Sequence, residues 1–129
     1  KTLLEKMQAA CQNSDRIMVG REKEKICGML WFQLKGAFGM YPYLHLIFIP
    51  DSMKGNGVGR ELMRYLEYYA LNGEGQKIKS RIFLTAGSWN EGAIEFYDRL
   101  GYTTIGVIPS LFRKNVEERL LMKVCNRVL

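Results

Sequence analysis

Lys54-Gly55-Asn56-Gly57-Val58-Gly59-Arg60 is the most informative stretch of this 129-residue chain. It follows an apolar segment, residues 41–49, and overlaps a segment with apolar residues at helical spacing, residues 58–69, so it predicts a loop between a buried strand and a helix. The first backbone N–H groups of a helix are unpaired, and the helix dipole favours anions there. Glycines at 55, 57 and 59 let an anion approach the backbone. The stretch therefore predicts a phosphate-binding loop in preference to a merely flexible turn.

Two phosphate-binding motifs do not fit this stretch. A dinucleotide fingerprint needs glycines at i, i+2 and i+5, but counted from Gly55 the last place is taken by Arg60. The acidic residue expected about twenty positions further on is also missing, since Gln76 and Lys77 stand there. A mononucleotide P-loop needs Gly-Lys followed by Ser or Thr, which the chain lacks.

The remaining sequence predicts a single domain, residues 1–129, of the α/β (mixed α+β) class. No repeat, low-complexity tract or proline-rich linker divides it. Periodicity and turn signals predict, in order, a helix over 3–11, strands over 16–21, 26–34 and 41–49, a helix over 58–72, a strand over 80–86, a helix over 91–100, and strands over 103–108 and 118–125. This order implies a mixed sheet with helices on both faces.

Composition restricts the partners and the compartment. Nineteen basic and thirteen acidic residues give a net charge of +6, which favours anionic partners. Cys11, Cys27 and Cys125 are odd in number and scattered, so we expect a reducing, cytoplasmic location and no disulfide framework. With His45 as the only histidine, no metal site is expected. No apolar run is long enough for a membrane span.

A second motif, Asn90-x-x-Ala93-x-x-x-Tyr97-x-x-x-Gly101-Tyr102, follows about thirty residues after the glycine-rich loop. It resembles the N-x-x-A-x-x-x-Y-x-x-x-G-F motif of the GCN5-related N-acetyltransferases, with Tyr in place of the final Phe. Lys54-x-x-Gly57-x-Gly59 is likewise similar to the coenzyme A pyrophosphate loop of that family, Q/R-x-x-G-x-G/A. Lys54 keeps a positive charge but lacks planar, bidentate geometry. The resemblance extends over roughly residues 17–124.

The resemblance implies a fold and an activity. The family's mixed sheet is splayed at its centre and begins with one more strand and helix than this sequence shows. We therefore expect a chain that is N-terminally incomplete and lacks that strand. The implied reaction transfers acetyl from acetyl-CoA to a primary amine by direct attack in a ternary complex, without a metal. The implied partners are coenzyme A and an amine-bearing small molecule or protein. A homodimer is also open, whereas membrane and nucleic-acid binding are not expected.

Tyr97 and His45 are the catalytic residues that the resemblance implies. Tyr97 stands at the place of the family's catalytic tyrosine, and a phenol with a pKa of about 10 is protonated at neutral pH and can act as a general acid. Its helical spacing alone would instead favour core packing. His45 precedes the glycine-rich loop, on a strand where some family members carry a histidine or glutamate base. A structural histidine, with ordered water as the base, is the alternative. Thr85 cannot act as a base at neutral pH.

The implied cofactor contacts involve backbone as well as side chains. Residues 47–49 are expected to pair with the pantetheine arm as an added strand would, and to offer an N–H to the oxyanion. Asn90 either caps its helix or binds the cofactor. The full implied cofactor-binding set is Ile47, Phe48, Ile49, Lys54, Gly55, Asn56, Gly57, Val58, Gly59, Arg60, Asn90 and Tyr97.

Two other functions are compatible with the sequence. Some domains of this fold bind coenzyme A without transferring acetyl, although the presence of Tyr97 argues against that role. The net charge of +6 would suit nucleic acid, but the basic residues are spread along the chain and no nucleic-acid motif is present. The acceptor class stays open between amino acid, polyamine, antibiotic, peptide N-terminus and protein lysine.

Overall fold

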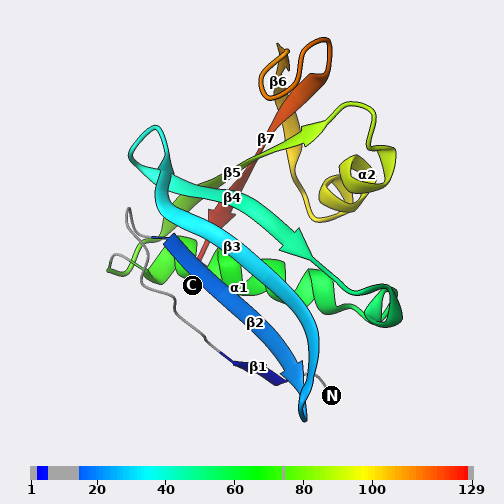
Figure 1. The fold of residues 1–129 in the computed structure, drawn as a ribbon. Helices are drawn as coiled ribbons and strands as arrows, with labels where there is room; N and C mark the ends of the chain where they lie inside the picture. The colour runs from blue at the N-terminus through cyan, green and yellow to red at the C-terminus, as the bar shows by residue number, and fades with distance from the viewer. Residues whose placement is uncertain (1–2, 6–14, 74, 128–129) are drawn as a thin grey trace.

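The computed structural model describes residues 3–5, 15–73 and 75–127. Within them, a seven-stranded sheet has the strand order β1-β2-β3-β4-β5-β7-β6 (Figure 1). The elements are β1 (Leu3–Glu5), β2 (Asp15–Glu22), β3 (Lys25–Ala37), β4 (Tyr41–Phe48), the 3-10 helix η2 (Asp51–Met53), α1 (Val58–Asn72), β5 (Lys79–Gly87), α2 (Glu91–Arg99), β6 (Thr103–Pro109) and β7 (Glu117–Asn126). β4 and β5 are parallel, and the other neighbouring strands are antiparallel. The predicted mixed α/β class is confirmed.

The sheet opens between its two parallel strands. In the described part of the chain, β4 pairs with β5 at Tyr43–Phe83 and Leu44–Leu84 only. Beyond that point β4 stays paired with β3 along residues 46–48, while β5 stays paired with β7 as far as Gly87. The two halves of the sheet therefore diverge (Figure 1), which leaves one edge of β4 without a neighbouring strand over its last residues. This divergence is the splayed centre that the resemblance implied.

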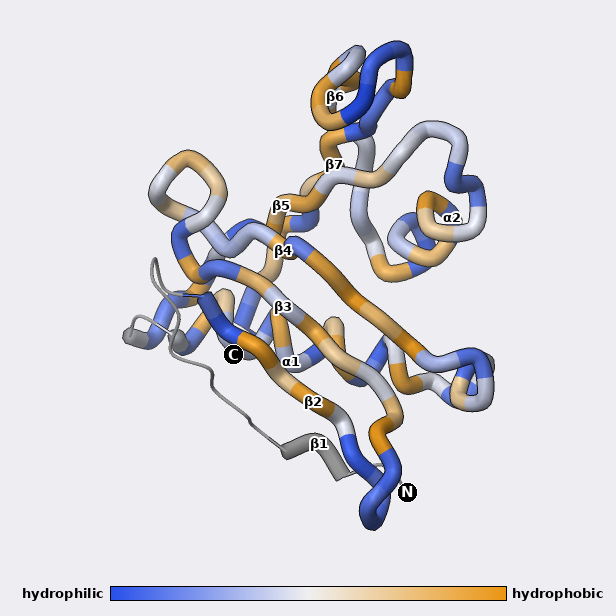
Figure 2. The backbone as a smooth tube through the Cα atoms, in the orientation of Figure 1, coloured by the Kyte–Doolittle hydropathy of each residue, from blue (hydrophilic) through white to orange (hydrophobic). Residues whose placement is uncertain are grey.

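The core lies on one face of the sheet. Register places Leu44, Leu84 and Leu121 opposite one another across β4, β5 and β7, so their side chains share a face. All three are buried, in a cluster to which both helices contribute. Figure 2 shows the hydrophobic segments along β2, β3, β4 and β5, and Figure 1 shows α1 running behind them. Neither described helix is long and apolar enough to cross a membrane.

The two described helices cover this same face, which differs from the expectation of helices on both faces. The physical reason is the handedness of the connections. The crossovers β4–α1–β5 and β5–α2–β6 advance in the same direction along the sheet. Right-handed crossovers that advance in one direction place their helices on one side. The opposite face carries no helix in the described ranges.

The start of the chain also differs from the sequence prediction. Leu3–Glu5 forms β1, which pairs antiparallel with β2, so the prediction of a helix over 3–11 is wrong at these residues. The rest of that predicted helix, residues 6–11, lies outside the described residues. The expected absence of a strand before β2 is wrong as well. A short apolar run is compatible with a helix or a strand. Here it forms a strand, because the edge of β2 offers backbone N–H and C=O groups with which it can pair.

Candidate active site

A cleft of about 1060 Å³ lies where β4 and β5 diverge. Its walls come from the end of β4, the glycine-rich loop with the start of α1, the end of β5, and α2. The site residues predicted from the sequence that line it are His45, Ile47, Phe48, Ile49, Lys54, Gly55, Gly57, Val58, Gly59, Arg60, Asn90 and Tyr97. Asn56, the remaining member of that set, does not line the cleft. The fold thus brings both motifs to one cavity.

The glycine-rich loop presents bare backbone to the cleft. Gly55 and Gly57 have φ angles of 83° and 79°, a left-handed conformation in which glycine costs least. A Cβ added at either position would meet nothing within 4 Å. Gly57 is the N-cap of α1, and no side chain caps that helix, so its first N–H groups are available to a ligand. Gly59 has a different role, since a Cβ there would lie 3.1 Å from the ring of Phe96 on α2.

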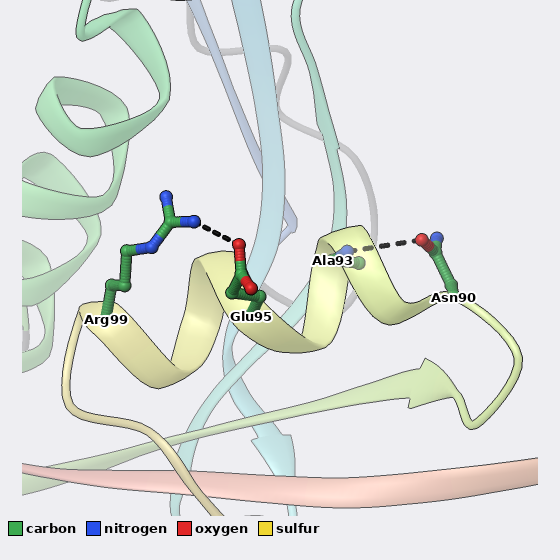
Figure 3. Close-up of polar contacts among 4 residues, drawn as sticks. All are labelled: Asn90, Ala93, Glu95 and Arg99. Atoms are coloured by element: carbon green, nitrogen blue, oxygen red, sulfur yellow. Dashed lines mark hydrogen bonds and ion pairs between the residues drawn. The ribbon is translucent and has the colours of Figure 1, made fainter.

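Positive side chains surround the loop. Lys54, Arg60 and Arg99 all line the cleft. Lys54 Nζ lies 2.9 Å from Asp51 Oδ1 in an exposed pair, and this hydrogen bond holds the pKa of Asp51 below its usual value. Arg99 pairs with Glu95 on α2, also in the open (Figure 3). Exposed pairs contribute little to stability, so both cations can exchange a carboxylate for a phosphate at small cost.

Asn90 determines where α2 begins. Its Oδ1 accepts a hydrogen bond of 3.2 Å from the backbone N–H of Ala93 (Figure 3). This is the helix cap that the sequence offered as one of two roles for Asn90. Because Asn90 lines the cleft as well, the cap fixes both this side chain and the helix that carries Tyr97.

Tyr97 is buried between α2 and the core, yet it lines the cleft. Its ring meets those of Phe96 and Tyr102 at centroid distances of 5.2 and 5.8 Å. Burial raises the pKa of Tyr97 to about 12, because the phenolate would lose its hydration. The hydroxyl therefore keeps its proton at neutral pH, and Tyr97 is suited to donate a proton and not to accept one. Tyr97 therefore packs against the core, as its helical spacing indicated, and also lines the cleft.

His45 occupies an irregular position in β4. Trp31 pairs with Leu46 and Phe32 with Leu44, so His45 is the extra residue of a β-bulge. Its side chain is exposed and lines the cleft. The imidazole stacks on the Trp31 ring at 4.7 Å and meets the Tyr43 ring edge-on at 4.9 Å. These rings orient His45 without burying it, so it is not a buried core histidine.

The last residues of β4 offer backbone groups to the cleft. Along an antiparallel pair, every second residue directs its N–H and C=O away from the partner strand. β3 pairs with one side of residues 46–48, and β5 has already separated from the other side. The backbone facing the cleft can therefore pair with an extended ligand as another strand would.

Several residues outside the predicted binding set also line the cleft, and Trp89, Arg99, Arg113 and Glu118 are among them. Trp89 and Arg99 adjoin the second motif, so position along the chain was a usable signal for them. Arg113 lies in the β6–β7 loop and Glu118 at the start of β7. Their proximity to β4 depends on the strand order β5-β7-β6, which spacing along the sequence does not contain.

Comparison with known proteins identifies the family to which this sequence is similar. The acetyltransferase (GNAT) family model matches residues 2–102. An uncharacterized N-acetyltransferase of Methanocaldococcus jannaschii is 36% identical over 70 residues, which make up 54% of this chain but only 29% of that protein.

Solved structures show the same fold. IAA acetyltransferase of Bacillus cereus has a TM-score of 0.77 at 14% identity, covering 96% of this chain and 99% of that chain. Spermidine/spermine N-acetyltransferase of Vibrio cholerae has a TM-score of 0.71 at 16% identity, covering 88% of this chain and 66% of that chain. Since the family model covers most of the sequence and the fold agrees with it, the chain belongs to the acetyltransferase (GNAT) family.

Proposed function

We propose that the protein is an N-acetyltransferase that moves an acetyl group from acetyl-CoA to a primary amine within a ternary complex. The observation that carries the proposal is a single cleft lined by the glycine-rich loop, a free strand edge and a protonated tyrosine. Family membership supports acetyl transfer in general terms. The spermidine/spermine N-acetyltransferase of V. cholerae, a structural relative, makes a polyamine one acceptor class to test.

The cleft fits acetyl-CoA in three separable parts. The loop around Gly57, with the first N–H groups of α1, would hold the pyrophosphate, and Lys54 and Arg60 add positive charge. The free backbone edge of residues 47–49 would pair with the pantetheine arm. Asn90 would contact the same arm from the start of α2. Asn56 is left out of this assignment because it does not line the cleft.

The chemistry needs a proton removed from the amine and a proton delivered to the departing sulfur. An alkylammonium has a pKa of about 10.4, so it must lose a proton before its nitrogen can attack the thioester carbonyl. His45 would accept that proton, directly or through water. A backbone N–H of the free β4 edge would stabilise the oxyanion. When the C–S bond breaks, Tyr97 would protonate the thiolate, and the nitrogen would release its second proton, which restores the phenol and gives the N-alkylacetamide and the free thiol.

A binding module without activity is the competing function, and turnover separates the two. We expect thiol release from acetyl-CoA to depend on added amine, measured with a thiol reagent over a panel of n-butylamine, putrescine, spermidine and glycinamide. Reactions without amine control for hydrolysis. Saturating coenzyme A should also raise the melting temperature, since ligand at about 100 times its dissociation constant raises the free energy of unfolding by about 2.7 kcal/mol. Binding without thiol release from any amine would refute the proposed activity and favour the binding module.

His45→Gln tests the proton acceptor. Glutamine keeps a polar side chain of similar reach but cannot take up a proton near neutral pH. If His45 is the base, the variant should have a lower kcat/KM and a pH profile of different shape, because its side chain cannot take the proton from the amine. The dissociation constant for acetyl-CoA, measured by calorimetry, should not change. Superimposable pH profiles for wild type and variant would assign the proton to ordered water instead.

A further inference from the structure

Glu118, at the start of β7, lines the cleft although its residue surface is only 6% exposed. In the described residues, no hydrogen bond or ion pair reaches its carboxylate. Asp51, the other carboxylate among the described lining residues, is exposed and paired with Lys54. The residue is mostly removed from water, but its carboxylate oxygens are not fully buried and remain open to the cleft. A carboxylate with little hydration and no partner gains from a cationic ligand. Its position therefore favours a ligand that brings a positive charge.

Strand register places Glu118 on the face of the sheet turned away from the helices. Glu118 lies opposite Gly87 in β5, and Leu120 lies opposite Thr85. Residues opposite one another share a face, and the intervening Ala86 belongs to the core on the other face. Glu118 and Thr85 are thus diagonal neighbours on the same face of the sheet, with their Cα atoms about 7–8 Å apart.

The proposed base reaches this same face. The Thr85 hydroxyl is hydrogen-bonded to that of Tyr43 at 3.0 Å, from β5 to β4. Tyr43 in turn contacts the imidazole of His45. The glycine-rich loop and Tyr97 belong instead to the helix side of the sheet. The cleft is therefore lined from both faces, with the coenzyme-binding elements on one side and His45, Thr85 and Glu118 on the other.

Trp89 adds an aromatic surface beside Glu118. Gly87 has no side chain, and a Cβ built there would lie 2.3 Å from Trp89 Nε1, so the indole occupies the space over the residue opposite Glu118. Trp89 is 64% exposed and lines the cleft. Its ring already takes one cation, because the guanidinium of Arg113 lies 5.7 Å from its centroid. A carboxylate beside an aromatic ring is a suitable pair for binding an alkylammonium.

We propose that Glu118 and Trp89 bind the ammonium group of the acceptor, on the face of the sheet opposite the helices. The inference rests on the proposed function and extends it to the acceptor: the substrate class is a primary amine that is protonated when it binds. Glu118 would hold the ammonium group by charge-assisted hydrogen bonds, and the exposed Trp89 ring would cover its alkyl carbons.

Glu118→Gln tests this site, with Glu117→Gln as the matched control. Glu117 is the adjacent residue of β7, is exposed, and its carboxylate accepts a hydrogen bond of 3.0 Å from the Ser88 hydroxyl. With the most active amine of the panel, Glu118→Gln should raise KM for the amine about tenfold. Both kcat and the calorimetric dissociation constant for coenzyme A should stay within about twofold of wild type, and Glu117→Gln should match wild type throughout.

Trp89→Leu provides an independent second variant. It should raise KM for the same amine about threefold, because the contact of the ring with the alkyl carbons contributes less than the charge of Glu118. Because no hydrogen bond or ion pair is lost among the described residues, the melting temperature of Glu118→Gln should not fall below that of wild type. An unchanged KM in Glu118→Gln, or a lowered melting temperature with kcat and KM reduced alike for every amine, would overturn the site while the proposed activity stands. A wild-type protein inactive toward every amine would overturn the activity itself.

Discussion

Gly57→Asp is expected to abolish acetyl-CoA binding, with a dissociation constant raised at least about a hundredfold. The new carboxylate would stand at the N-cap of α1, where the proposed pyrophosphate needs bare N–H groups, and like charges repel. The fold should survive, because a Cβ at this position meets nothing within 4 Å. Aspartate also tolerates a φ near 79° better than most residues. Calorimetry and the loss of the coenzyme A-induced rise in melting temperature measure the effect.

Gly39→Asp is the control for this substitution. Gly39 lies in the turn between β3 and β4, has a φ of 68°, and a Cβ there also meets nothing within 4 Å. It does not line the cleft. The backbone strain and the added charge are therefore matched, and this variant should bind acetyl-CoA like the wild type. If Gly57→Asp binds acetyl-CoA with wild-type affinity, the pyrophosphate does not bind at this loop. If both variants lose affinity for acetyl-CoA equally, backbone strain causes the loss.

The elements that the sequence predicted well are those whose signals are local. α1 begins at Val58 and ends at Asn72, as its apolar spacing and the following Gly73 indicate. Asn90 caps α2 through its own side chain, so one residue sets that boundary. The strand before the loop was recognisable because nearly all of its residues are apolar. Its predicted burial is wrong for the last residues, since Leu46 and Phe48 are exposed where β5 diverges. These features need no knowledge of which strands become neighbours.

The parts that the sequence did not predict depend on pairing between distant segments. The face of the sheet on which a crossover helix packs depends on the strand order. The spacing of apolar residues predicts the two helices but not that α1 and α2 pack on the same face. The exposure of His45 comes from a bulge against Trp31 and Phe32, which a regular alternation does not contain. Glu118 enters the cleft because β7 lies beside β5. In the sequence alone, a glutamate at the start of a strand reads as a solvent-exposed residue.

Tyr97→Phe is expected to lower kcat about a hundredfold, equivalent to about 2.7 kcal/mol in the barrier. The substitution removes only the hydroxyl, so the ring contacts with Phe96 and Tyr102 and the dissociation constant for acetyl-CoA should persist. Loss of the Tyr97 proton would lower the rate as pH rises. With the pKa of Tyr97 raised to about 12, that fall should lie above the pH range of an ordinary assay. Rates of thiol release from pH 6 to about 10 measure both effects.

Tyr102→Phe is the matched control, because Tyr102 is also a buried tyrosine whose pKa burial raises, and its ring touches that of Tyr97. It does not line the cleft, and its hydroxyl is buried without a hydrogen-bond partner among the described residues. Removing that hydroxyl should leave kcat unchanged and hold or raise the melting temperature, since an unsatisfied polar group disappears from the core. If both variants lose activity equally, the hydroxyl of Tyr97 acts through packing and not as an acid. If neither does, the thiolate leaves without a proton from Tyr97, and the acid must be sought among water molecules at the same cleft.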